Sequence, residues 1–156
     1  MKLSHTDSNG NLNMVDVGEK KETIRTARAE GQITMKPETL TAIRGNTLEK
    51  GDILTCAKVA GIQGAKKTHE LIPLCHNIPI DKIEVTFEFE SDNTIKIKSF
   101  AKCFYKTGIE MEAITAVSVA ALCIYDMCKA VDRSMVINYI KLVEKTGGVS
   151  GEYKSI

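Results

Sequence analysis

The sequence predicts one α+β domain in which an antiparallel sheet carries helices on one of its faces. Alternating apolar and polar residues at positions 82–104 are typical of a β-hairpin, and a long alanine-rich segment at positions 109–131 is typical of a buried helix. If residues 22–35 form a strand, the elements follow the order β-α-β-β-α-β. This is the order of the ferredoxin-like split β-α-β-β-α-β fold.

Length and composition fit a single domain. The chain has 156 residues, of which 43% are apolar and 26% are charged, as in an ordinary globular protein. Residues 1–20 are polar and lack a sustained apolar period. We therefore expect a flexible N-terminal arm over residues 1–20 and a single ferredoxin-like domain over residues 21–156. His5 in the arm is either solvated or folds over a bound ligand.

The first half of the domain combines one ambiguous segment with two helices. Residues 22–35 mix alanines, which favour a helix, with Ile and Thr, which favour a strand, so local propensity leaves the segment open. Pro37 suits the first turn of a short helix over residues 38–43. Apolar positions at helical spacing predict another helix over residues 51–71, which Pro73 ends.

The second half gives clearer signals. Strands at residues 82–90 and 94–104 flank a Ser-Asp-Asn turn, and the predicted helix at residues 109–131 is too long to be a strand. A last strand over residues 135–143 leads into a glycine-rich loop at residues 145–151, which we expect to end the ordered chain.

Charge and cysteine content exclude several classes of protein. Lys and Arg number 21 against 20 Asp and Glu, a net charge of +1, which provides no overall field for nucleic acid or an anionic membrane. The longest apolar runs are shorter than the roughly 18 residues that span a bilayer, and the start resembles no signal peptide. We expect a cytoplasmic protein. Five cysteines without a C-x-x-C motif favour reduced core residues over disulfides or a zinc site.

Polar residues interrupt apolar patterns in three segments, at residues 71–77, 106–112 and 125–129. The first contains Cys75 and His76. Adjacent residues in an extended segment point to opposite sides, so we do not expect these two to act together as nucleophile and base. A packed cysteine and a capped histidine are the alternative.

The other two segments lie on the long predicted helix. Glu110 and Glu112 in its first turn either interact with the helix dipole or face a ligand at the free N–H groups. Asp126 and Lys129 form either a surface ion pair or an acid–base pair whose pKa values apolar surroundings move towards neutrality. Glu112 and Asp126 are about 21 Å apart along one helix. A site that uses both must combine two chains, as two-fold pairing would.

Basic residues suited to phosphate are scattered, and each is also compatible with a solvated surface. They are Arg25, Lys50, Lys66, Lys67 and Lys145. The chain contains no G-x-x-x-x-G-K-[ST] and no G-x-G-x-x-G, which excludes a standard P-loop or Rossmann nucleotide site.

Six blocks of the sequence, taken in chain order, closely resemble the MoaC family of cyclic pyranopterin monophosphate synthases. The blocks are residues 14–17, 50–52, 60–63, 71–76, 106–113 and 124–130. The resemblance covers nearly the whole chain and implies that residues 22–35 form a strand. It also implies a homohexamer, built as a trimer of dimers, with active sites at subunit interfaces. Asn77 replaces a common proline, and Val149 interrupts a glycine loop that usually carries lysine.

The resemblance also implies a reaction and its residues. The substrate would be 3′,8-cyclo-7,8-dihydroguanosine 5′-triphosphate, supplied by a radical S-adenosylmethionine GTP cyclase, and the products cyclic pyranopterin monophosphate and pyrophosphate. The implied catalytic residues are Asp126, Lys129 and Lys50. The implied substrate-binding residues are Leu74, Cys75, His76, Met111, Glu112, Arg25, Lys66 and Lys145, with Glu110 beside them. No cofactor or protein-bound metal is expected, and Mg²⁺ on the phosphates is left open.

Two other functions remain to be weighed against this one. A non-catalytic ferredoxin-like module that binds a nucleotide and regulates a partner would keep the fold without the acid–base pair. General GTP hydrolysis is disfavoured because the chain shows no phosphate loop.

Overall fold

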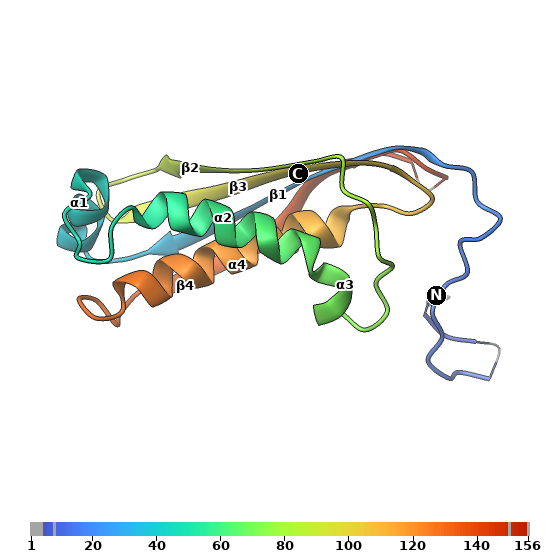
Figure 1. The fold of residues 1–156 in the computed structure, drawn as a ribbon, viewed down its shortest axis with the longest axis horizontal. Coiled ribbons are helices and arrows are strands. Elements are labelled where there is room, and N and C mark those ends of the chain that lie inside the picture. Colours follow the sequence, from blue (N-terminus) through green and yellow to red (C-terminus); the bar gives the residue numbers. More distant parts are fainter. Residues whose placement is uncertain (1–4, 8, 150, 156) are drawn as a thin grey trace.

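The computed structural model describes residues 5–7, 9–149 and 151–155 and has the predicted α+β architecture. Five antiparallel strands form one sheet in the order β2-β3-β1-β4-β5, with the helices on one face (Figure 1). The elements are β1 Thr23–Thr34, α1 Pro37–Gly45, α2 Ile53–Lys66, α3 Thr68–Leu71, β2 Lys82–Phe89, β3 Thr94–Tyr105, α4 Glu110–Cys128, β4 Val136–Thr146 and β5 Tyr153–Lys154. The ferredoxin-like fold class is confirmed. Residues 1–4 and 8 of the expected arm lie outside the described residues.

The ambiguous first segment is the central strand β1. It pairs with β3 along its whole length, from Thr23 opposite Tyr105 to Thr34 opposite Thr94, and its other edge pairs with β4. Every second residue from position 25 to position 33 is buried towards the helices. Hydrogen bonds on both edges, rather than local propensity, therefore decide this element.

The core lies between the sheet and the helices α2 and α4. α4 contributes buried residues along its length, and α2 packs closely against it: a Cβ added to Gly61 would lie 2.7 Å from the carbonyl oxygen of Ala116. By length and composition α4 alone, among the described residues, is apolar enough to cross a membrane, although half of that stretch is buried inside the domain. The charged residues Glu110, Glu112 and Asp126 interrupt α4, so it contains no unbroken apolar run of that length. Core helices of soluble domains pass the same test.

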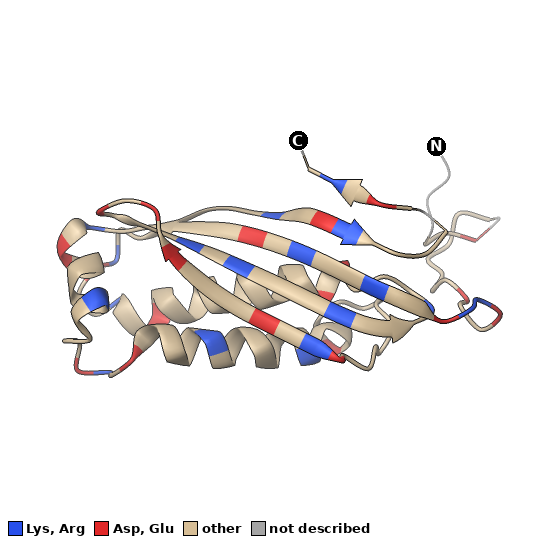
Figure 2. Ribbon diagram, turned by 90° about the horizontal axis from the view of Figure 1, so that it is seen from above, with Lys and Arg blue, Asp and Glu red and all other residues tan. Residues whose placement is uncertain are grey.

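The other face of the sheet is open and carries charges of both signs. Figure 2 shows acidic and basic residues interspersed along the strands. Lys98 pairs with Glu88 at 2.6 Å, and the Arg28 guanidinium lies 4.6 Å from the centroid of the Phe100 ring. Exposed pairs of this kind contribute little to stability, so the helix-covered face holds the fold together.

Several boundaries differ from the sequence predictions, among them the end of α4, which lies at Cys128 and not at Val131. The helix expected over residues 51–71 breaks at Lys67 into α2 and α3, because the Thr68 hydroxyl donates to the carbonyls of Gly64 and Ala65 and competes with the helical pattern. The last strand extends to Thr146 because it continues to pair with β1. The glycine loop does not end the ordered chain, since β5 beyond it pairs with β4.

The cysteines only partly follow the expectation of core residues. Cys103 and Cys128 are fully buried, but Cys56 is exposed and Cys75 and Cys123 are half-buried. The last three thus lie where a ligand or another thiol can reach them.

Candidate functional site

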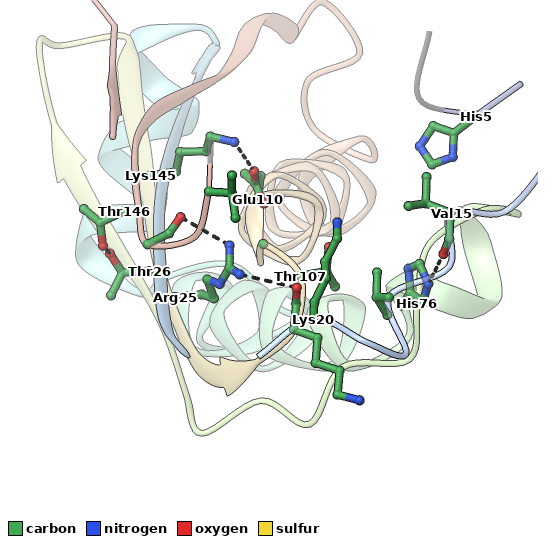
Figure 3. A pocket seen from close by; sticks show the side chains of 15 residues that line it. His5, Val15, Lys20, Arg25, Thr26, His76, Thr107, Glu110, Lys145 and Thr146 are labelled. Carbon is green, nitrogen blue, oxygen red and sulfur yellow. Dashed lines mark hydrogen bonds and ion pairs between the residues drawn. The ribbon is translucent and has the colours of Figure 1, made fainter. Parts of the chain in front are cut away.

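A cleft lies at the end of the domain where the N-terminal arm, the start of β1 and the start of α4 meet (Figure 3). It consists of two chambers that share several walls, among them His76, Gly108 and Glu110. The larger, the basic chamber, has a volume of about 570 Å³ and is lined by Lys20, Arg25, Lys106 and Lys145. The smaller, the carboxyl chamber, has a volume of about 240 Å³ and is lined by Leu74, Cys75, Met111 and Glu112.

Arg25 is the buried cation of the basic chamber. It lies on the face of β1 that packs towards the helices and is only 8% exposed. Its guanidinium donates to the carbonyls of Gly147 at 3.2 Å and Lys106 at 3.3 Å, and its Nε–H has no partner among the described residues. A buried donor without a partner is costly, so a ligand oxygen is the group this position favours.

The glycine-rich loop after β4 closes around this arginine. Gly148 has a φ of +82°, and a Cβ added there would lie 1.6 Å from an Arg25 nitrogen. Only glycine allows both the left-handed backbone and the approach of the guanidinium. Val149 lines the chamber in place of the usual lysine, so Arg25 and Lys145 carry the positive charge at this wall.

Glu110 and Lys145 form an ion pair across the basic chamber. The Lys145 ammonium lies 2.7 Å from the Glu110 carboxylate, and about a quarter of each side chain is exposed. The pair joins the start of α4 to the end of β4. Glu110 therefore interacts with Lys145 as well as with the helix dipole, and a bound anion could replace Glu110 as the partner of Lys145.

Glu112 is the most perturbed acid of the site. It is only 3% exposed, and its Oε2 has no hydrogen-bond partner among the described residues. Burial raises its pKa to about 7, with Glu110 adding to the rise and the Glu112 backbone N–H opposing it. Burial, followed by the charge of Glu112, also raises the pKa of the Cys75 thiol. The carboxyl chamber therefore contains a group that exchanges protons near neutral pH.

Cys75 and His76 both line the carboxyl chamber, and the expectation that they do not act together as nucleophile and base stays a prediction. The segment is a turn rather than a strand, with the Cys75 N–H donating to the Ile72 carbonyl at 3.1 Å. A ring nitrogen of His76, Nε2, lies 2.9 Å from the Val15 carbonyl oxygen. Because a carbonyl only accepts, Nε2 carries the proton and Nδ1 is the nitrogen left for a ligand.

The described part of the arm forms a wall of the cleft. Besides the Val15 contact, Gly18 accepts a hydrogen bond from the Lys106 ammonium at 2.7 Å. His5 lines both chambers, as the ligand-facing interpretation of this histidine requires. Lys20 and Lys106 were missed as candidate anion ligands. Lys106 opens a segment that the sequence marked, but nothing in the sequence distinguishes Lys20.

The predicted acid–base pair, Asp126 and Lys129, lies at the opposite end of α4 from this cleft. Lys129 and Asp126 form an ion pair of 2.6 Å, and the Lys50 ammonium donates to the Asp126 backbone carbonyl at 3.1 Å. Both members of the pair are more than half exposed. Hydrogen bonding to Lys129 lowers the pKa of Asp126, because the ammonium and the solvent stabilise the carboxylate. Within one chain the structure thus shows the first of the two alternatives, a surface ion pair.

The structure therefore brings together one group of predicted residues and separates another. Residues of the cleft are Arg25, Leu74, Cys75, His76, Glu110, Met111, Glu112 and Lys145. Lys50, Asp126 and Lys129 form the second cluster. Lys66 is exposed in the last turn of α2 and lines neither chamber.

The basic chamber of this α+β domain holds four cations, and the carboxyl chamber beside it holds a carboxyl group with a pKa of about 7. These are the features of an enzyme cleft for a polyanionic small molecule. Comparison with known proteins gives the family. The MoaC family model matches residues 14–148. The chain belongs to the MoaC family.

Curated relatives match over nearly their full length. The chain is 53% identical over 151 residues to the cyclic pyranopterin monophosphate synthase of Brevibacillus brevis, covering 97% of this chain and 94% of that one. It is 52% identical over 155 residues to the protein of the same name from Clostridium acetobutylicum, covering 99% and 96%. A likeness to the full extracellular region of zebrafish Gpr126/Adgrg6 has a TM-score of 0.34 and 14% identity, and covers 89% of this chain and 16% of that one.

Proposed function

We propose that this protein is a lyase of molybdenum cofactor biosynthesis, a cyclic pyranopterin monophosphate synthase. It converts 3′,8-cyclo-7,8-dihydroguanosine 5′-triphosphate to cyclic pyranopterin monophosphate and releases pyrophosphate. Relatives of that name, 52–53% identical over nearly the whole chain, support this activity. The observation that carries it is a cleft that joins a cationic chamber to a chamber with a near-neutral carboxyl group.

The basic chamber suits the triphosphate. Lys20, Arg25, Lys106 and Lys145 come from four places in the chain and surround one volume. Closing the cyclic phosphate expels pyrophosphate, and fixed cations stabilise the negative charge that grows on this leaving group. The Glu110 carboxylate pairs with Lys145 at 2.7 Å and would give way to a phosphate oxygen.

The carboxyl chamber suits the heterocycle and its proton transfers. Glu112, Cys75 and His76 supply an acid, a thiol and an imidazole within 240 Å³, about the volume of a small ring system. Ring opening and pyran formation require groups that give and take protons near neutral pH. Glu112, with a pKa raised to about 7, fits that requirement best among these side chains.

The second cluster, Lys50, Asp126 and Lys129, which we call the catalytic cluster, is proposed to complete the site from a neighbouring subunit. Asp126, Lys129 and Lys50 are exposed at the end of α4 opposite the cleft, where no small ligand of their own chain reaches both clusters. In a homohexamer built as a trimer of dimers, the cluster of one subunit would meet the cleft of another. Removal from water at that interface would then bring the Asp126–Lys129 pair to the pKa values that catalysis needs.

Mixing two inactive variants tests the shared site. Glu112→Ala and Asp126→Ala subunits, inactive alone, should recover about a quarter of wild-type activity when equal amounts exchange, because one site in four then receives both intact halves. Exchange is verified by native mass spectrometry with one variant isotopically labelled. Complete mixing without recovered activity would contradict sites formed between subunits.

Incubation with the cyclic dihydro-GTP substrate distinguishes the alternatives. The wild-type protein should form the cyclic monophosphate and one pyrophosphate per product, measured by liquid chromatography with mass detection. Binding without turnover would favour the regulatory module. Steady phosphate release from plain GTP would favour general hydrolysis.

Arg25→Lys should raise KM for the triphosphate substrate roughly tenfold and lower kcat less. The guanidinium can donate to the carbonyls of Gly147 and Lys106 and to a phosphate oxygen at the same time, and one ammonium cannot reproduce that geometry. Steady-state kinetics measure both constants. Arg44→Lys is the matched control, since Arg44 stacks on Phe89 far from the cleft. A KM unchanged from wild type would remove Arg25 from the phosphate site.

The remaining parts of the proposal concern the cell and the cofactor. A radical S-adenosylmethionine GTP cyclase would supply the substrate, and the enzyme would act in the cytoplasm. It would need no resident cofactor, with Mg²⁺ entering, if at all, on the phosphates. Measuring product formation with a chelator of divalent ions present tests whether the reaction needs such an ion.

A further inference from the structure

Two thiols from neighbouring helices face each other outside the cleft. The Sγ of Cys123 on α4 lies 3.6 Å from the Sγ of Cys56 on α2. These residues are 67 positions apart in the sequence, and the antiparallel packing of α2 against α4 brings them together (Figure 1). Cys56 is exposed and Cys123 is half-buried. The proposed reaction uses neither thiol.

We propose that Cys56 and Cys123 form a reversible oxidation site, at which a peroxide converts the two thiols into an intrachain disulfide between α2 and α4. A disulfide requires an S–S distance of roughly 2 Å, so each sulfur must move by less than about 1 Å. A small rotation of each side chain provides this without separating the helices. The exposed thiol gives the oxidant access, and the half-buried thiol is in place to complete the bond.

The chemistry balances with hydrogen peroxide as the oxidant. The Cys56 sulfur, after losing its proton, attacks one peroxide oxygen, the O–O bond breaks, and the departing hydroxide takes a proton to leave as water. The Cys123 sulfur then attacks the sulfenic acid on Cys56, the S–O bond breaks, and a second water leaves with the Cys123 proton. Two thiols lose two electrons in total, and the peroxide gains them. A thiol reductant reverses the change.

The disulfide would lie beside the exposed catalytic cluster. Cys123 precedes Asp126 by one helical turn, and burial raises the pKa of the Cys123 thiol, with the Cys56 thiol and then the charge of Asp126 adding to the rise. Lys50 reaches Asp126 from the segment that leads into α2. A bond between Cys56 and Cys123 would therefore fix the start of α2 to the end of α4 and resist separation of these elements on heating.

Peptide mass mapping without reduction tests the proposal. The native, fully reduced chain is treated with a modest excess of hydrogen peroxide. It should lose two of its five free thiols and yield one linked peptide pair, Cys56 with Cys123, that a thiol reductant separates. The oxidised protein should unfold at a temperature roughly 5–10 °C higher than the reduced form.

Variants make the result specific. Cys56→Ala, an exposed change that leaves the core intact, and Cys123→Ala should each abolish the linked pair and the rise in Tm. Cys75→Ser, the matched control, should retain both. Five intact thiols after treatment, a Cys56 sulfinic acid beside a free Cys123, or a crosslink between two subunits would each overturn the proposal.

Discussion

Replacing Glu112 with glutamine is expected to lower kcat for product formation at least about 100-fold, the usual contribution of a general acid or base. The amide keeps the shape of the side chain, which is only 3% exposed, but it cannot act as a general acid or base. Any remaining activity should lose the pH dependence that a group with a pKa of about 7 confers. Rapid-quench assays across pH 5–9 measure both effects.

The same substitution should stabilise the folded chain at alkaline pH. Burial raises the pKa of Glu112 from 4.5 to about 7, so between these values the folded state holds a proton that the unfolded chain releases. The free energy of unfolding of the wild type therefore falls as pH rises through this range. Glu112→Gln escapes that loss and should be more stable by up to about 3 kcal/mol at pH 8, with little difference at pH 4.

Glu70→Gln is the matched control, because Glu70 is an exposed carboxylate on α3 that forms an ion pair with Lys67. It should change neither kcat nor the pH dependence of stability. Chemical denaturation at pH 4 and pH 8 gives the stabilities. A Glu112→Gln enzyme with wild-type kcat would show that the near-neutral carboxyl group is a consequence of packing and not part of the reaction.

Replacing Asp132 with alanine is expected to cost the fold at least about 3 kcal/mol. Asp132 lies in the turn between α4 and β4 and is 1% exposed. One carboxylate oxygen accepts from the Lys36 N–H and the Thr39 hydroxyl at the start of α1, and the other accepts from the N–H and hydroxyl of Ser134. Removing the carboxylate leaves four donors without their acceptor, and one of them, the Thr39 hydroxyl, is buried.

The pH dependence of this contribution has the opposite sign to that of Glu112. Burial alone would raise the pKa of Asp132, but hydrogen bonds from Lys36, Ser134 and Thr39 outweigh it and hold the pKa at about 2. The stabilisation is therefore present above pH 3.8 and is lost as pH falls through 2. Asp132→Asn should lose less than Asp132→Ala, and the exposed Asp92→Ala almost nothing. Equal urea midpoints for Asp132→Ala and wild type at pH 7 would contradict this role.

Local patterns in the sequence were enough to predict most of the fold. The hairpin and α4 follow from alternation and from length, because a one-sided strand and a buried helix leave different periods in the chain. The first segment was different, since alanines and β-branched residues compete there, and only hydrogen bonding to β3 and β4 makes it a strand. The break at Lys67 and the extra strand β5 also depend on contacts that no local pattern contains.

The candidate site divides in the same way. Glu110, Glu112, Cys75 and His76 were identifiable because they interrupt apolar runs. Local patterns placed Arg25 only among scattered basic residues, because they left open whether residues 22–35 form the strand whose buried register it occupies. Lys106 opens a marked segment but was not itself chosen, and Lys20 had no signal, because a lysine in a loop has the same local pattern whether or not it faces a ligand.

The sequence by itself determined the family, the order of the elements and the chemical types available, because these depend on residue identity and spacing along the chain. Only the tertiary structure decided which of those residues act on one another. It joined the arm, β1 and the glycine loop into one cationic chamber, raised the pKa of Glu112 by burying it, and left Asp126 ionised beside Lys129. Desolvation and distance set those properties, and both arise from segments that are remote in sequence.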